Sequence, residues 1–380
     1  MRFACVEFIT KGGDIWRHSS GRPNYLADHL REIDATSYGT WTSALQGEHV
    51  PLHWFISGRP GPGIGGKFGL RLRAEIKWNR WRGRSSVSFD NIGYLNNFDI
   101  VLVCFHASMH RIMREFVEAA RAASPALTML GTHATFGVGL AREKWKDAEW
   151  FNDLRLFMNA CDVFAIANLE AKDYFSLVSK TPVVYLPQFY PVSYTQKYFR
   201  PRESKVPVIF VSGPTNRTDI VWSCLLAREL QRRFPQFEIQ VTGSKGFNFQ
   251  PLEGARYRVL PRMGWEEYLD VTSRAHLILN TDSTWTNGRV QADAAAVGTP
   301  CIGVNAGRQT ELFPELACPD IGGTGQALGF GARLIQDEGF YRQIAADAFA
   351  RLDQWSYERG PAKLDQMISA HRAGSSLTPG

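Results

Sequence analysis

Short apolar runs that alternate with amphipathic stretches of helix length restrict the fold of this chain most strongly. In the first half, runs rich in β-branched and aromatic residues occur at 2–9, 99–105, 127–130, 162–167 and 181–186, and helix-like segments such as 109–123 separate them. Strands that are apolar throughout and alternate with helices form parallel sheets covered on both faces. The first half therefore predicts a doubly wound α/β domain.

A second series of the same kind follows a proline-rich segment. Residues 187–207 contain four prolines and little periodicity, which is typical of an interdomain linker. Apolar runs then recur at 208–211, 237–241, 257–260, 276–279 and 300–304, alternating with helical patterns near 218–234, 265–274 and 288–298. We therefore expect two Rossmann-like domains, 1–190 and 205–354, that face a central cleft. The helical tail, at about 355–375, is expected to complete the first domain.

Composition excludes several classes of protein. With 44% hydrophobic residues, 24 Phe and 11 Trp in 380 residues, the chain has enough apolar surface for packed cores and is not a disordered protein. No apolar run reaches the 18 residues of a membrane span, and the N-terminus lacks the pattern of a secretory signal, so a cytoplasmic protein is expected. The cysteines have no metal-ligand spacing, so we predict no metal and expect buried thiols.

One basic segment accounts for the whole net charge of +6. Between residues 67 and 84 stand seven Lys or Arg and one Glu, and the rest of the chain is balanced. Six residues interleave cations with tryptophans: Lys77, Trp78, Arg80, Trp81, Arg82 and Arg84. This pattern predicts a surface for an anionic acceptor, either nucleic acid with tryptophans stacked on bases or an anionic lipid surface. A solvated helix or loop face is the alternative interpretation.

The segment 282–304 has local features of a phosphate site. A polar loop containing Thr286, Asn287 and Gly288 leads into an Ala-rich helix, whose free N–H groups suit a diphosphate. An N-cap followed by a packed helix is the other interpretation. The glycine pattern at 61–66 matches a dinucleotide fingerprint, but Pro60, Pro62 and the arginine-rich continuation favour a loop.

The order of several motifs resembles that of the retaining GT-B glycosyltransferases, in particular the family 4 type. The motifs are GTHATFG at 131–137, VSGPTNRTD at 211–219, QVTGSKG at 240–246 and QADAAAVGTPCIGV at 291–304. The resemblance implies a two-domain GT-B fold and transfer of a sugar, with retention, from a nucleotide-diphosphate sugar. It also implies an acceptor on the first domain, a donor on the second, a UDP-sugar as the favoured donor, and no cofactor.

The resemblance implies a set of site residues. Arg217 and Lys245 match the family's diphosphate-binding cations, and His133 is expected to orient or deprotonate an acceptor hydroxyl, with His106 as a weaker candidate. Trp285 stands where the family has its first acid, so Asp282 is the nearest substitute. The expected donor-binding residues are Gly12, Gly13, Gly213, Arg262, Met263, Thr286, Asn287, Gly288 and Asp293, the last as the ribose-binding acid.

Three functions are compatible with these observations. The first is a glycosyltransferase acting on an anionic acceptor, DNA or a lipid-linked molecule. The second is a non-catalytic protein that binds a nucleotide sugar or nucleic acid on a GT-B scaffold, because the first acid of the family motif is displaced. The third, an epimerase with the same architecture, requires further acid and base residues that the sequence does not place.

Overall fold

The computed structural model describes residues 2–7, 16–17, 39–56, 87–105, 110–133, 147–212, 220–243, 249–261, 263–283 and 286–372. Within it the chain divides into two compact units. Unit 1 comprises residues 1–166 and 171–188, and unit 2 comprises residues 167–170 and 189–380. Each unit is built on its own sheet.

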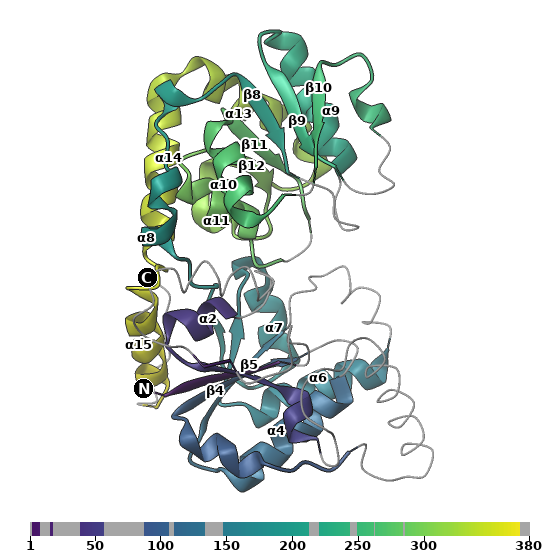
Figure 1. The fold of residues 1–380 in the computed structure, drawn as a ribbon. Helices are drawn as coiled ribbons and strands as arrows, with labels where there is room; N and C mark the ends of the chain where they lie inside the picture. The colour runs from purple at the N-terminus through teal and green to yellow at the C-terminus, as the bar shows by residue number, and fades with distance from the viewer. Residues whose placement is uncertain are drawn as a thin grey trace. The chain divides into compact units, whose positions relative to one another are not determined.

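Unit 1 is a doubly wound α/β unit (Figure 1). Across the described residues its sheet has seven strands in the order β2-β3-β1-β4-β5-β6-β7, and every pairing except β2 with β3 is parallel. The strands are β1 (Phe3–Glu7), β2 (Trp16–Arg17), β3 (Glu48–Pro51), β4 (Ile100–Phe105), β5 (Thr128–His133), β6 (Val163–Ile166) and β7 (Val183–Tyr185). The strand order reverses between β1 and β4, which makes that pair the topological switch point.

The described helices of unit 1 pack apolar side chains into the core. They are α2 (Gly39–Ala44), α4 (His110–Ala123), α6 (Ala148–Ala160) and α7 (Lys172–Val178), with 3-10 turns η1 (Leu52–Phe55) and η2 (Ile92–Asn97). On α4, Ile112, Phe116 and Ala120 recur at helical spacing and are buried. Asp147 caps α6 by accepting hydrogen bonds from the N–H groups of Glu149 and Trp150.

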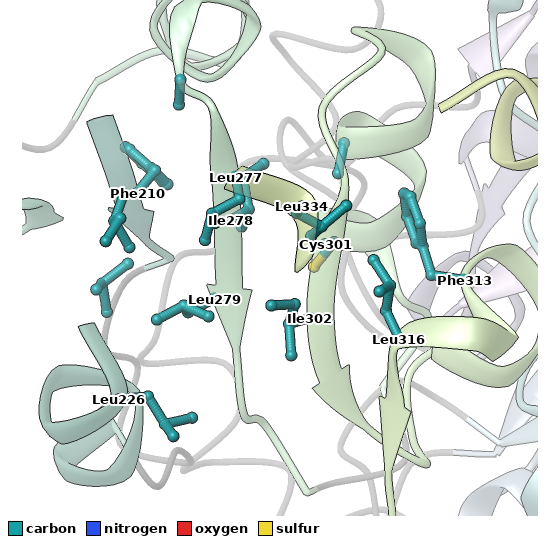
Figure 2. Packing of buried hydrophobic residues seen from close by; sticks show 14 of the residues in the cluster. Phe210, Leu226, Leu277, Ile278, Leu279, Cys301, Ile302, Phe313, Leu316 and Leu334 are labelled. Atoms are coloured by element: carbon teal, nitrogen blue, oxygen red, sulfur yellow. The ribbon is translucent and has the colours of Figure 1, made fainter. Parts of the chain in front are cut away.

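Unit 2 is a second doubly wound unit with an all-parallel sheet. Its described strands run in the order β10-β9-β8-β11-β12-β13. They are β8 (Val208–Val211), β9 (Glu238–Thr242), β10 (Tyr257–Leu260), β11 (Leu277–Asn280), β12 (Cys301–Val304) and β13 (Ala317–Cys318). Figure 2 shows Phe210, Leu279 and Ile302 from three of these strands in the buried core. The switch point of this sheet lies between β8 and β11.

Helices and 3-10 turns connect the strands of unit 2 and extend beyond them (Figure 1). The helices are α8 (Val192–Thr195), α9 (Ile220–Arg233), α10 (Trp265–Arg274), α11 (Arg289–Ala296), α12 (Gln309–Leu312), α13 (Thr324–Gln336), α14 (Glu338–Asp353) and α15 (Gly360–Arg372). The 3-10 turns are η3 (Leu169–Ala171), which crosses the unit boundary, η4 (Gln196–Tyr198), η5 (Arg202–Ser204), η6 (Gln250–Leu252), η7 (Pro314–Leu316) and η8 (Ile321–Gly323). Among these, α13 packs against both α9 and α14.

The predicted fold class is confirmed, and each predicted apolar run contains a strand. Three strands were not predicted: β2 and β13 are two residues long, and β3 ends at Pro51. In the tail predicted to be helical at about 355–375, the helix α15 begins only at Gly360, and a non-helical segment separates it from α14. There Tyr190 N–H donates to the Trp355 carbonyl at 2.9 Å, and Tyr357 N–H donates to the Tyr190 carbonyl at 3.1 Å. The segment predicted as a linker thus packs on unit 2.

The C-terminal helix falls in unit 2 in this division, whereas the sequence-based prediction joins it to the first domain. Gly360, the first residue of α15, lies against the ring of Phe189, where a Cβ atom would come within 2.5 Å of a ring carbon. Both residues belong to unit 2. Because Gly360 has no Cβ atom, α15 can approach the Phe189 ring this closely.

A buried histidine makes the stability of unit 2 depend on pH. The ring of His276 lies beside Phe237 and Tyr341, its Nε2 donates to the Leu334 carbonyl at 3.2 Å, and burial lowers its pKa from 6.5 to about 4. Between pH 4 and pH 6.5 the imidazole is protonated in the unfolded chain and neutral in the folded protein. The free energy of unfolding therefore rises with pH over this range. We expect this histidine to contribute about 3 kcal/mol to the loss of stability on acidification.

The measurement is urea unfolding at several pH values for the wild type and His276→Asn. The variant is expected to lose less stability than the wild type between pH 6.5 and 4, because it has no imidazole to protonate. Other groups contribute equally to both curves. Parallel curves would show that the imidazole is not held neutral in the folded state.

Candidate donor site

The loop after β11 leads into the N-terminus of α11 at the carboxyl edge of the second sheet. Gly288 is the N-cap residue of α11, with φ 63° in the left-handed region, and no side chain caps the helix. A Cβ atom at this position would lie 2.0 Å from the Gly307 carbonyl oxygen. Only glycine fits here, and the first N–H groups of α11 are left for a ligand or water.

A second loop, between β12 and α12, packs against the first. Gly307 and Arg308 both have left-handed backbones, with φ 59° and 68°. The buried Arg308 side chain donates to both carboxylate oxygens of Glu311, at 2.5 and 2.9 Å. The loop lies against the N-terminus of α11, because the Gly307 carbonyl and the Arg308 side chain are the atoms nearest to Gly288.

Three polar side chains of unit 2 lie at these loops: Asn168 and Asn287 are buried, and Glu170 is half-buried. Asn168 is 3% exposed, and its Nδ2 donates to the Thr286 carbonyl at 3.3 Å. Glu170 accepts a hydrogen bond from the Thr310 hydroxyl. Among the described residues, Asn168 Oδ1, Glu170 Oε2 and Asn287 Nδ2 are buried without a hydrogen-bond partner. Buried polar atoms are normally satisfied, so a polar ligand is the expected partner.

Asp293 lies on α11 inside a buried polar cluster. Its Oδ1 accepts hydrogen bonds from the Tyr190 hydroxyl at 2.6 Å, from Trp265 Nε1 at 3.0 Å and from Arg289 Nε at 3.1 Å. The Arg289 guanidinium lies 4.6 Å from the centre of the Trp265 ring. Burial raises the pKa of the Tyr190 hydroxyl well above its usual value, so the hydroxyl stays a donor. The cluster orients the first turn of α11.

The structure brings four predicted donor residues together: Thr286, Asn287, Gly288 and Asp293 all lie on α11 or the loop before it. Asp282 is half-buried in the same loop, where its N–H donates to Asn280 Oδ1. Met263 is half-buried just before α10. The other predicted residues lie outside the described residues: Gly12, Gly13, Lys77, Trp78, Arg80, Trp81, Arg82, Arg84, His106, Gly213, Arg217, Lys245, Arg262 and Trp285, together with the glycine pattern at 61–66.

His133 ends β5 in unit 1, within an aromatic group. Its ring centre lies about 6 Å from those of Phe105, Trp150 and Phe175. The imidazole therefore packs among three aromatic rings. Its role toward an acceptor stays a prediction.

A histidine and an aspartate that sequence reasoning missed form a pair in unit 1. His110 Nδ1 on α4 lies 2.6 Å from Asp153 Oδ2 on α6, and Arg114 Nη1 is 3.4 Å from Asp153 Oδ1. A carboxylate at Nδ1 holds the imidazole in one orientation. His110 and Asp153 stand 43 residues apart, and no local pattern links them.

No helix in the described part of the chain is long and apolar enough to cross a membrane.

No family model matches the sequence, and no curated protein matches it. Solved structures do match. The two Rossmann-like units define the fold as GT-B, the two-domain architecture of one large class of glycosyltransferases.

Three of the similar structures are a sucrose-phosphate synthase and two trehalose-phosphate synthases. Sucrose-phosphate synthase from Thermosynechococcus elongatus matches over 98% of this chain and 100% of its own, with a TM-score of 0.60 and 15% identity. The trehalose-6-phosphate synthase OtsA matches over 100% of both chains, with a TM-score of 0.62 and 10% identity. A UDP-forming α,α-trehalose-phosphate synthase from Burkholderia vietnamiensis matches over 100% of this chain and 99% of its own, with a TM-score of 0.59 and 11% identity. At these identities the likeness establishes the fold.

Proposed function

We propose that the chain is a glycosyltransferase that uses a nucleotide-diphosphate sugar, with a UDP-sugar as the first candidate. The observation that carries the proposal is the uncapped N-terminus of α11, bordered by buried amides of Asn168 and Asn287 with polar atoms unused among the described residues. A helix N-terminus stabilises the negative charge of a diphosphate, and the amides offer hydrogen bonds to sugar hydroxyls. The GT-B fold and its UDP-forming structural neighbour support the same assignment.

The proposed chemistry is sugar transfer with retention. The bond between the anomeric carbon and the diphosphate oxygen breaks, and an acceptor hydroxyl bonds to that carbon and loses its proton. The enzyme accelerates this step by stabilising charge on the departing diphosphate. Arg217 and Lys245 are the cations proposed for that task, in addition to the N-terminus of α11. Asp282 is proposed to contact the donor sugar.

The proposed acceptor is anionic, and the support for it is the charge between residues 67 and 84. Lysines and arginines interleaved with tryptophans suit a phosphate-bearing polymer, with DNA as the first acceptor to supply and lipid-linked phosphates as the second. The turnover assay therefore includes both. Binding of a nucleotide sugar without any product would favour the non-catalytic alternative.

The donor proposal is tested with Asn287→Asp. The wild type is expected to gain about 2.7 kcal/mol of stability from one diphosphate at 100 times its Kd, in a thermal-shift panel of UDP, GDP, ADP and TDP with their sugars. The new carboxylate should weaken diphosphate binding at least about tenfold through like-charge repulsion at the helix end. Urea unfolding without ligand is measured in parallel to separate lost binding from lost stability, because a carboxylate at this buried position gains from the helix end but loses hydration.

Gln326→Glu is the matched control. Gln326 is exposed in the first turn of α13, another helix whose N-terminus has no side-chain cap. It adds the same charge near another uncapped helix N-terminus, outside the proposed donor site, and should leave diphosphate binding unchanged. No stabilisation of the wild type by any diphosphate, or equal affinity in both variants, would contradict the proposal.

A further inference from the structure

Three potential metal ligands meet at the carboxyl end of two neighbouring strands in unit 1. Cys5 and Glu7 lie on β1, and Cys104 lies on β4. The Sγ atoms of the two cysteines are 3.9 Å apart, and the three ligand atoms all lie within 4.8 Å of one another. All three residues are buried. The proposed sugar transfer assigns no role to any of them.

Strand pairing accounts for this juxtaposition. In the register of the parallel β1–β4 pair, Cys5 is opposite Leu102 and Val6 is opposite Val103. The next residues in this register are Glu7 and Cys104. Because side chains alternate along a strand, Cys5, Glu7 and Cys104 share one face of the sheet. The pair β1–β4 is also the switch point of this sheet, and ligands of doubly wound domains bind beyond the carboxyl ends of such strands.

The spacing of the sulfur atoms matches coordination to one ion. Two thiolates at about 2.3 Å from a tetrahedral zinc ion lie about 3.8 Å from each other. Two sulfurs and one carboxylate form a donor set that suits zinc, whereas calcium and magnesium take oxygen ligands.

A disulfide fits this geometry less well. Cys5 and Cys104 lie on adjacent parallel strands two residues apart in register, and a strand spacing of about 4.8 Å with a rise of about 3.3 Å per residue separates their Cα atoms by about 8 Å. Disulfides join Cα atoms that are at most about 6.8 Å apart. An S–S bond would therefore require the strands to shift, while an ion would bridge the sulfur atoms where they stand.

We infer that unit 1 binds a zinc-like divalent cation through the two sulfur atoms of Cys5 and Cys104 and the carboxylate of Glu7. On binding, each thiol releases its proton to solvent as its metal–sulfur bond forms, and the carboxylate binds as it is. Burial, together with Cys5 and Glu7 nearby, raises the pKa of the Cys104 thiol well above its usual value. A cation compensates this cost by stabilising the thiolate. The ion links β1 to β4 at the switch point.

The test begins with the full-length protein after removal of metal by a chelator. Titration with Zn²⁺ should give about one equivalent bound by elemental analysis and a higher melting temperature. Titration with Co²⁺ should give thiolate-to-cobalt charge-transfer absorption, which reports sulfur ligands in the wild type without any mutation. Binding of less than a tenth of an equivalent of either ion, or Co²⁺ binding without that absorption, would overturn the inference.

Variants then locate the site. Cys5→Ser and Cys104→Ser should weaken Zn²⁺ binding at least about tenfold, and Glu7→Gln should weaken it while both sulfur ligands remain. Cys161→Ser is the matched control, since Cys161 is a buried cysteine of unit 1 whose Sγ donates to the Phe157 carbonyl. Its Zn²⁺ affinity should equal that of the wild type. Unchanged affinity in the first two variants would place the metal elsewhere and refute the site.

Discussion

Replacement of Asp293 by alanine is expected to lower the free energy of unfolding by about 3–5 kcal/mol. The carboxylate is 2% exposed and accepts hydrogen bonds from Tyr190, Trp265 and Arg289. Its removal takes away the negative partner of the buried Arg289 guanidinium. It also leaves the Tyr190 hydroxyl and Trp265 Nε1 without this acceptor. Urea unfolding of the wild type and the variant measures the loss.

Asp270→Ala is the matched control for this prediction. Asp270 also pairs with arginines, Arg274 four residues away and Arg200, but all three side chains are partly exposed, at 34%, 57% and 38%. Exposed pairs contribute about 1 kcal/mol or less. Equal destabilisation by the two alanine variants would show that the Asp293 cluster contributes no more than a surface pair.

Asp293→Asn separates the structural role of this residue from the predicted ribose contact. The amide keeps an acceptor oxygen for Tyr190 and Trp265 and removes the charge. If Asp293 also binds ribose, the loss of binding free energy for the nucleotide in this variant should exceed its loss of unfolding free energy. Affinity that falls only where the protein has begun to unfold would leave the residue with the structural role alone.

Gly288→Ala is expected to cost about 3 kcal/mol of stability and to abolish the diphosphate-dependent thermal shift. The left-handed backbone alone costs a residue with a Cβ about 1–2 kcal/mol. The added Cβ would also meet the Gly307 carbonyl oxygen at 2.0 Å, so one of the two loops at the N-terminus of α11 must move. The measurements are unfolding in urea and thermal shift with UDP.

The control for this prediction is Gly254→Ala. Gly254 has φ 79°, also in the left-handed region, but nothing lies within 4 Å of an added Cβ. This variant isolates the backbone cost, and it should lose about 1–2 kcal/mol and keep the diphosphate response. If the two variants were equally stable and bound UDP equally well, the close packing of the Gly288 and Gly307 loops would not contribute to the site.

The donor loop was predictable in part because its chemistry is local. Thr286, Asn287 and Gly288 are consecutive residues between a strand and a helix, so sequence alone indicates a polar loop at a helix N-terminus. The partners of this loop were not predictable. Asn168 stands 118 residues before Thr286, and Gly307 reaches Gly288 through a separate loop. Asp293 was predicted to face ribose, and its engagement by Tyr190 depends on a segment interpreted as a linker.

Sequence by itself determined the succession of strands and helices, because the periodicity of buried side chains reflects backbone geometry over a few residues. It also determined that two sheets form, since strands alternate with helices in two series. Only the tertiary structure decided which strands are neighbours, and with them the pairs Cys5–Cys104 and His110–Asp153. Strand order is set by packing between residues far apart in the chain, and no local pattern records it.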